Sequence, residues 1–240
     1  MSLNYQVSSE LLNINENKRK IYEENIIKKC EKCSVEGKAS CQKCVLSTKL
    51  LFRYYNANIS VDYWSRNIDG FKGDEQLVKL YNLLTKDITK TYESGISYLL
   101  KGSHGNGKTF FASLVIKKFV EKGYSGLYTT LSEIVNVLLH SDFKAKITAD
   151  KCLKICDILV IDEFDTRHMG NSENAGMLFG KLLESVLRIR LQNKMPTILI
   201  TNNPDPTKAL GDALGASITS LISGYVKEIN VIGRDFRKVK

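Results

Sequence analysis

The stretch GSHGNGKT, Gly102 to Thr109, decides the fold, because it matches the pattern G-x-x-x-x-G-K-[ST] of phosphate-binding loops. Its glycines permit a tight turn that aims backbone N–H groups at phosphate oxygens. Lys108 can reach the β- and γ-phosphates, and the Thr109 hydroxyl can ligate Mg²⁺. The predicted nucleotide-binding residues are Gly102, Ser103, His104, Gly105, Asn106, Gly107, Lys108, Thr109 and Phe110.

The residues on both sides of this loop supply the context that the motif requires. The apolar stretch ISYLLK precedes it and predicts a strand, and TFFASLVIKKFVEK follows it and predicts a helix ended by Gly123. The N-terminus of such a helix carries a partial positive charge, which favours an anion at the loop. The motif is therefore interpreted as a phosphate site and not as a chance match.

A second stretch, ILVIDEFD from Ile158 to Asp165, predicts a buried strand that ends in acidic residues. Ligands of parallel α/β sheets bind at the carboxyl ends of the strands. We therefore expect Asp162 to hold Mg²⁺ and Glu163 to polarise the water that attacks a phosphate. A solvent-facing acidic strand end is the alternative, and the phosphate-binding loop upstream argues against it.

From about residue 95 onward, apolar strands alternate with helical segments. The further predicted strands are GLYTT (126–130) and PTILITN (196–202), and the further predicted helices are LSEIVNVLLH (131–140) and ENAGMLFGKLLESVLRIRLQNK (173–194). Continuous apolar strands are typical of a parallel sheet covered on both faces, so we predict a three-layer α/β fold. Asn202 or Asn203, at the end of the last strand, can contact a γ-phosphate or orient a water molecule.

In this order the motifs resemble those of the AAA+ helicase loaders of the DnaC and DnaI type and of their transposition relatives of the IstB type. GSHGNGKT matches their Walker A motif, IDE their Walker B motif and PTILITNN their third strand; FRYYNANISVDYW and VIGRDFR are softer matches. The resemblance runs from about residue 30 to the end. It implies a P-loop AAA+ fold and an ATPase that uses ATP and Mg²⁺, with Asn203 as the sensor-1 residue beside the catalytic Lys108, Asp162 and Glu163.

The resemblance also implies a helical insertion between the second and third strands, which in the family helps to contact single-stranded DNA. LSEIVNVLLHSDFKAKITADKC (131–152) occupies this place. Phe143 precedes Lys144, with Lys146 close by, and an aromatic ring among lysines can stack a base while the lysines follow the backbone. The alternative, that Phe143 is a core residue and the lysines are merely solvated, stays open.

The chain departs from the family at GDALGASITSLISG, Gly211 to Gly224. Loaders typically carry here an arginine that reaches a neighbour's ATP, whereas this stretch contains no Arg or Lys. A trans arginine accelerates hydrolysis by on the order of 10³-fold or more, so slow turnover is expected, or ATP binding that acts as a switch. The candidate substitutes are Arg188, Arg190, Arg234 and Arg237.

The stretch CEKCSVEGKASCQKC holds four of the six cysteines in two C-x-x-C pairs: Cys30, Cys33, Cys41 and Cys44. This spacing predicts four thiolates around a tetrahedral Zn²⁺; a redox pair and an iron–sulfur cluster are the alternatives. A closed Cys₄ site has no open position for catalysis, so the segment is interpreted as a binding module. In DnaI-type loaders a similar module grips the helicase.

The composition fits a cytoplasmic protein with an anionic partner. The formal net charge is +9 with a pI of about 9.1, which favours nucleic acid, although a lysine-rich surface also serves solubility. No apolar run is long enough to span a bilayer, and the N-terminal residues lack the pattern of a secretory signal. We expect a zinc module within residues 1–50, an aromatic-rich connecting arm at 51–94 and an AAA+ domain at 95–240.

Three functions remain in competition. The first is a loader that places a replicative hexameric helicase onto single-stranded DNA, with self-assembly as an additional expectation. The second is a transposition or DNA-remodelling ATPase of the IstB type. The third is a nucleotide-regulated adaptor with little turnover, which the arginine-free stretch 211–224 favours.

Overall fold

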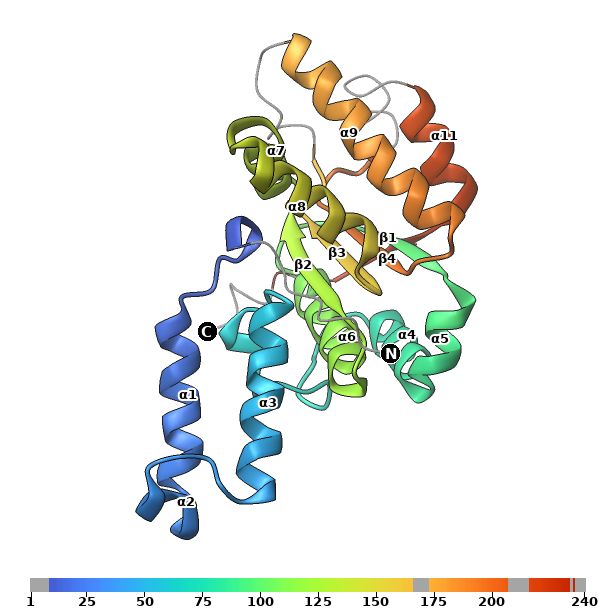
Figure 1. The fold of residues 1–240 in the computed structure, drawn as a ribbon. Coiled ribbons are helices and arrows are strands. Elements are labelled where there is room, and N and C mark those ends of the chain that lie inside the picture. Colours follow the sequence, from blue (N-terminus) through green and yellow to red (C-terminus); the bar gives the residue numbers. More distant parts are fainter. Residues whose placement is uncertain (1–8, 166–172, 207–215, 234, 236–240) are drawn as a thin grey trace.

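A five-stranded parallel sheet forms the centre of the protein (Figure 1) in a computed structural model that describes residues 9–165, 173–206, 216–233 and 235. The strand order is β2-β3-β4-β1-β5, so that β4 lies between the strand before the phosphate-binding loop and the strand that ends in Asp162. The strands are β1 (Ser97–Lys101), β2 (Gly126–Thr130), β3 (Ile158–Asp162), β4 (Thr197–Thr201) and β5 (Val226–Asn230). The predicted parallel α/β fold is confirmed.

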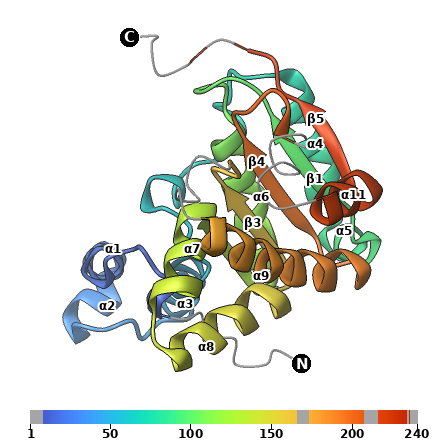
Figure 2. The same ribbon diagram turned by 90° about the horizontal axis from the view of Figure 1, so that it is seen from above.

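Helices cover both faces of the sheet, as the view from above shows (Figure 2). Alternate residues of β1 separate the two layers, because Tyr98 and Leu100 pack toward α6 while Leu99 belongs to the core on the other face. One layer contains α4 (Glu75–Lys86), α5 (Ile88–Ser94) and α6 (Lys108–Lys122). The other contains α7 (Leu131–His140), α8 (Phe143–Ile155), α9 (Glu173–Gln192) and α11 (Ala216–Tyr225).

Every strand predicted from the sequence is present, and β5 is an additional one. Its sequence, VKEIN, lies at the edge of the sheet beside β1, and three of its five residues are exposed. It therefore lacks the continuous apolar run that identifies a buried strand.

The N-terminal helices project away from the sheet (Figure 1). The elements are η1 (Ser9–Leu11), α1 (Glu16–Lys28), α2 (Glu31–Glu36) and α3 (Gln42–Asn56). α1 and α3 pack side by side, and α2 lies at their far end. α3 runs past the predicted boundary at residue 50 and packs on α6, and Leu11 is fully buried in the core beside α7 and α8.

The arm between α3 and α4 wraps onto α6. It contains the short helix η2 (Val61–Tyr63) and the buried Trp64, the only tryptophan of the chain. The Trp64 indole donates to the carbonyl of Ile59 at 2.7 Å, and its ring lies 6.2 Å from that of Tyr54 and 5.2 Å from that of Tyr22. Trp64 therefore lies where α1, α3 and the arm meet.

None of the helices in the described residues is both long and apolar enough to cross a membrane.

Candidate functional site

The phosphate-binding loop connects β1 to α6, as the sequence predicts. Gly107 is the N-cap of α6 and adopts φ 94°, a left-handed conformation that side chains with a Cβ rarely tolerate. The ring of Phe71 lies against Gly107, only 2.4 Å from the position that a Cβ would occupy. A glycine is thus required here both by the backbone conformation and by the packing of the arm.

Lys108 lies inside this loop and is 4% exposed. Its ammonium donates to the carbonyls of Gly102 and Ser103 at 2.7 and 2.8 Å. It also donates to the side-chain oxygens of Asn106 and Asn202, each at 3.0 Å. The cation is therefore held by the loop itself and by the end of β4, in a position suited to meet a phosphate.

Asp162 and Thr109 come together across the two motifs. The Thr109 hydroxyl donates to Asp162 Oδ2 at 2.8 Å, and the Tyr128 hydroxyl donates to the same oxygen. Burial, followed by the charge of Asp162, raises the pKa of Tyr128 well above its usual value, so Tyr128 stays a protonated donor. Carboxylate and hydroxyl oxygens are the ligands that Mg²⁺ prefers, so this donor set fits that ion.

Glu163 follows at the tip of β3 with φ 50°, a conformation that is uncommon for a residue with a side chain. Its backbone N–H donates to Asp162 Oδ1 at 2.7 Å, and its side chain is exposed along the cavity described below. Backbone strain of this kind clusters at functional sites. The two successive carboxylates therefore both line the cavity, Asp162 bonded to Thr109 and Glu163 more exposed.

The two asparagines after β4 have different surroundings. Asn202 accepts from Lys108, whereas the side-chain oxygen of Asn203 accepts the backbone N–H of Asp205 at 2.9 Å. Asn202 lines the cavity beside Lys108, and Asn203 is not among the residues that line it. The family resemblance implies Asn203 as the sensor-1 residue, but its neighbour Asn202 is the one that contacts the phosphate-binding loop.

These groups border a cavity of about 420 Å³, a size that suits a small ligand. Three aromatic side chains, Tyr63, Phe71 and Phe110, also line the cavity and form an aromatic wall beside the loop. The Phe71 and Phe110 rings stack 5.3 Å apart and 6° from parallel, and Tyr63 meets Phe110 edge-on at 5.9 Å. The lining of the cavity therefore combines a cation and polar groups with an aromatic surface.

The four N-terminal cysteines converge as predicted. Their sulfur atoms all lie within 4.8 Å of one another, and those of Cys30 and Cys41 are 3.8 Å apart. A tetrahedral zinc with bonds of about 2.3 Å separates its sulfurs by about 3.8 Å, so the donor set fits zinc. Cys30 precedes α2 and Cys41 precedes α3, so the two helix starts hold the cluster together.

The surroundings of two cysteines shift the pKa values of their thiols in opposite directions. The backbone N–H groups of Cys41 and Ser40 donate to Cys33 and lower the pKa of its thiol to about 6. Burial, followed by contact with Cys41, raises the pKa of the Cys44 thiol to about 12. Four ionised thiols this close are unfavourable without a metal, which couples binding to deprotonation.

The predicted DNA-contact residues lie at the start of α8. Phe143 is 79% exposed and Lys144 is exposed, so the alternative that Phe143 is a core residue is wrong. Lys146 instead turns back and donates to the carbonyl of Leu139 at 3.0 Å, at the C-terminal end of α7. Of the three predicted contact residues, Phe143 and Lys144 are exposed and Lys146 is half-buried.

The candidate arginines differ in their burial and in their hydrogen-bond partners. Arg190 is fully buried and donates to the carbonyls of Leu153, Cys156 and Pro196 and to the Thr197 hydroxyl, so it is a structural residue. Arg188 is half-exposed and donates to Glu184 at 2.6 Å and to Ser217 at 3.0 Å. Ser217 belongs to the arginine-free stretch on α11. Arg234 and Arg237 lie outside the described residues.

Residues 98–214 match the family model described as "ATPase family associated with various cellular activities (AAA)". This match covers the glycine-rich and acidic motifs and the strands β1 to β4, and it leaves out β5. The chain therefore carries an AAA ATPase domain. No curated protein matches the chain significantly.

Solved structures with the same fold include replication proteins. The DnaC helicase loader superposes with a TM-score of 0.58 at 19% identity, over 72% of this chain and 100% of that chain. DnaI superposes with a TM-score of 0.54 at 18% identity, over 71% of this chain and 87% of that one. AMPPCP-bound DnaA from Aquifex aeolicus gives a TM-score of 0.56 at 15% identity, over 72% and 51%. At these identities the likeness is one of fold.

Sequence reasoning left out two parts of the site. Tyr128 pairs with Val160, which precedes Asp162 by two residues on β3. The pairing of β2 with β3 is therefore the signal that could have placed Tyr128 near Asp162. Tyr63 and Phe71 of the aromatic wall carry no local signal, because they are far from the loop in sequence, whereas Phe110 is among the predicted nucleotide-binding residues.

Proposed function

We propose that this protein is an ATP-dependent loader that delivers a replicative hexameric helicase to single-stranded DNA. The observation that carries the proposal is the meeting of Lys108, the Thr109–Asp162 pair and Asn202 at one cavity of an AAA ATPase domain. The fold shared with the DnaC loader and DnaI supports the replication context.

In this proposal ATP binds with its phosphates at the loop and its base at the aromatic wall. Lys108 neutralises the β- and γ-phosphates, and Glu163 polarises the attacking water from its exposed position in the cavity. Thr109 and Asp162 would hold Mg²⁺, which when bound compensates the charge of the phosphates. Phe110 and Phe71 already stack, so a base has a flat apolar surface beside the loop.

The zinc module is proposed to bind the helicase. A groove of about 530 Å³ lies between α1 and α3 beside the zinc site and includes the apolar side chains of Ile27 and Phe52. Three exposed basic residues, Lys38, Lys49 and Arg53, surround it. An apolar floor with a basic rim suits an acidic, amphipathic segment of a partner protein.

The test is co-purification with the hexameric helicase of the same host. A Lys38→Glu/Lys49→Glu/Arg53→Glu variant should lose the helicase while it retains zinc and nucleotide, because these side chains lie on the surface. A matched Lys79→Glu/Lys86→Glu/Lys90→Glu variant, which reverses three exposed lysines on α4 and α5, should bind as the wild type does. Helicase binding that survives the triple change would contradict the role of the groove.

The ATPase part is tested by Glu163→Gln, which should trap the ATP-bound state and leave nucleotide affinity nearly unchanged. Strong ATP-dependent binding to duplex DNA, with no helicase partner, would instead favour a transposition ATPase.

A nucleotide-regulated adaptor is the second candidate, and the observation that favours it is α11. This helix contains neither Arg nor Lys, and Arg188 approaches it already paired with Glu184. Tight ATP binding with background turnover, unchanged by Glu163→Gln, would support the adaptor over the loader that hydrolyses ATP.

A further inference from the structure

Lys117 is a buried lysine that the catalytic site does not use. It lies on the side of α6 that faces the arm, two turns beyond the phosphate-binding loop, and is 8% exposed. Burial lowers its pKa from the usual lysine value. Burying an ammonium group costs free energy unless hydrogen bonds replace its water, so a lysine at this position calls for a structural reason.

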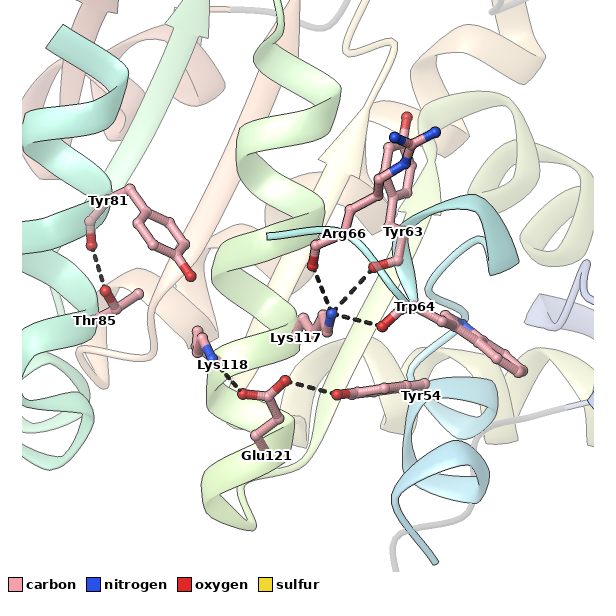
Figure 3. Close-up of polar contacts among 9 residues, drawn as sticks. All are labelled: Tyr54, Tyr63, Trp64, Arg66, Tyr81, Thr85, Lys117, Lys118 and Glu121. Atoms are coloured by element: carbon pink, nitrogen blue, oxygen red, sulfur yellow. Dashed lines mark hydrogen bonds and ion pairs between the residues drawn. The ribbon is translucent and has the colours of Figure 1, made fainter. Parts of the chain in front are cut away.

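The ammonium is satisfied by one short piece of the arm (Figure 3). It donates to the carbonyls of Tyr63 at 3.2 Å, Trp64 at 2.7 Å and Arg66 at 2.8 Å. An ammonium group has three donors, and these three bonds use all of them. The ring of Tyr54 lies 5.5 Å from the Lys117 nitrogen and adds a cation–π contact.

The same piece of the arm forms one side of the nucleotide cavity. Tyr63, whose carbonyl accepts from Lys117, places its ring edge-on against Phe110. The chain then continues to Phe71, which stacks on Phe110 and packs on Gly107. The aromatic wall therefore begins at a turn whose carbonyls are held by α6, the helix that also starts with Lys108.

We propose that Lys117 is a positioning residue for base recognition: its ammonium fixes the turn at residues 63–66, and thereby the aromatic wall, relative to the phosphate-binding loop. The proposal rests on the proposed nucleotide binding and adds to it the group that sets the distance between base and phosphate subsites. Lys117 touches no ligand itself and acts through Tyr63 and Phe71.

Other contacts hold the arm elsewhere, so the effect of Lys117 is local. The Trp64 indole bonds to Ile59, and the Asp74 carboxylate accepts the backbone N–H of Ile232 at 2.8 Å. The adjacent Lys118 points away from the arm and pairs with Glu121, which also accepts from Tyr54 (Figure 3). Lys118 is thus a matched control on the same helix.

The experiment compares two ligands by calorimetry, Mg-ATP and Mg-tripolyphosphate, because only the first has a base. Lys117→Met should weaken Mg-ATP binding by about tenfold, the effect of losing one aromatic–base contact. Binding of tripolyphosphate should stay within about twofold of wild type, since the loop is unchanged. Lys118→Met should leave both affinities as they are.

Equal weakening of both ligands, or no weakening of either, would overturn the positioning role. If Lys117→Met does not fold, Tyr63→Leu provides the measurement, because it removes the ring and keeps the ammonium; selective loss of ATP supports the proposal and unchanged ATP affinity overturns it. A wild-type protein that binds neither ligand, or a Lys108→Ala variant that binds both normally, would instead show that the proposed nucleotide site is wrong.

Discussion

Asn202, and not Asn203, is expected to be the asparagine that supports ATP hydrolysis. Asn202→Ala removes the side-chain oxygen that accepts from the Lys108 ammonium at 3.0 Å. Asn203→Ala removes an oxygen that accepts the N–H of Asp205, in a surface contact where water can replace it. The two adjacent changes are chemically identical, so each serves as the control of the other.

The expected loss of kcat/KM follows from the hydrogen bonds that Lys108 keeps in the Asn202→Ala variant. A hydrogen bond to a charged group contributes about 1.5–3 kcal/mol. Lys108 keeps its bonds to Gly102, Ser103 and Asn106, so the lower figure applies if Asn202 only positions the lysine. The higher figure applies if Asn202 also contacts the γ-phosphate. Asn202→Ala should therefore lower kcat/KM by about 10- to 150-fold, and Asn203→Ala by less than about threefold.

The assay is steady-state ATP hydrolysis with saturating Mg²⁺, together with nucleotide affinity and a thermal melt for each variant. Both variants should fold and melt near the wild type, because both side chains lie at a loop. A larger loss in Asn203→Ala than in Asn202→Ala would refute this reasoning and restore the assignment that the family resemblance implies.

Three further outcomes are expected. Arg190→Met should lower the free energy of unfolding by about 3–5 kcal/mol in chemical denaturation, because it removes the buried guanidinium that donates to the carbonyls of Leu153, Cys156 and Pro196; a change below 1 kcal/mol would contradict this. Tyr128→Phe should raise the Mg²⁺ concentration for half-maximal nucleotide binding by about tenfold, since Asp162 loses a partner that orients it; an unchanged Mg²⁺ dependence would count against that role. Cys33→Ser, or treatment with a zinc chelator, should abolish zinc content and lower the helical signal of α1–α3, whereas nucleotide affinity should change less than about threefold; full helicity without zinc would show that the metal is not needed for folding.

The sequence predicted the parts of the site that are local. The loop from Gly102 to Thr109 and the strand that ends in Asp162 each combine an apolar run with polar residues at fixed spacing. Such patterns reflect backbone geometry within a few residues, so they can be read without the fold. The four cysteines follow the same logic, because two short loops suffice to bring their sulfurs together.

The remaining parts depend on contacts between distant segments. Which of Asn202 and Asn203 faces the loop depends on where β4 ends relative to β1, and a shift of one residue exchanges them. Lys117 resembles a solvated lysine in the helical run VIKKF, and its burial follows only from the arm that crosses α6. The predicted connecting arm at 51–94 also supplies Tyr63 and Phe71 to the lining of the cavity, which its sequence did not indicate.

The single tryptophan makes this arrangement observable without a label. Its indole lies beside Tyr22 of α1 and Tyr54 of α3, while its own carbonyl accepts from Lys117 on the helix that begins at the phosphate-binding loop. A rearrangement that moves the helices around the cysteine cluster relative to the ATPase core would alter the environment of this indole. Intrinsic tryptophan fluorescence, followed during rapid mixing with ATP or with a partner, can therefore report the rates of nucleotide binding and of partner binding in the unmodified protein.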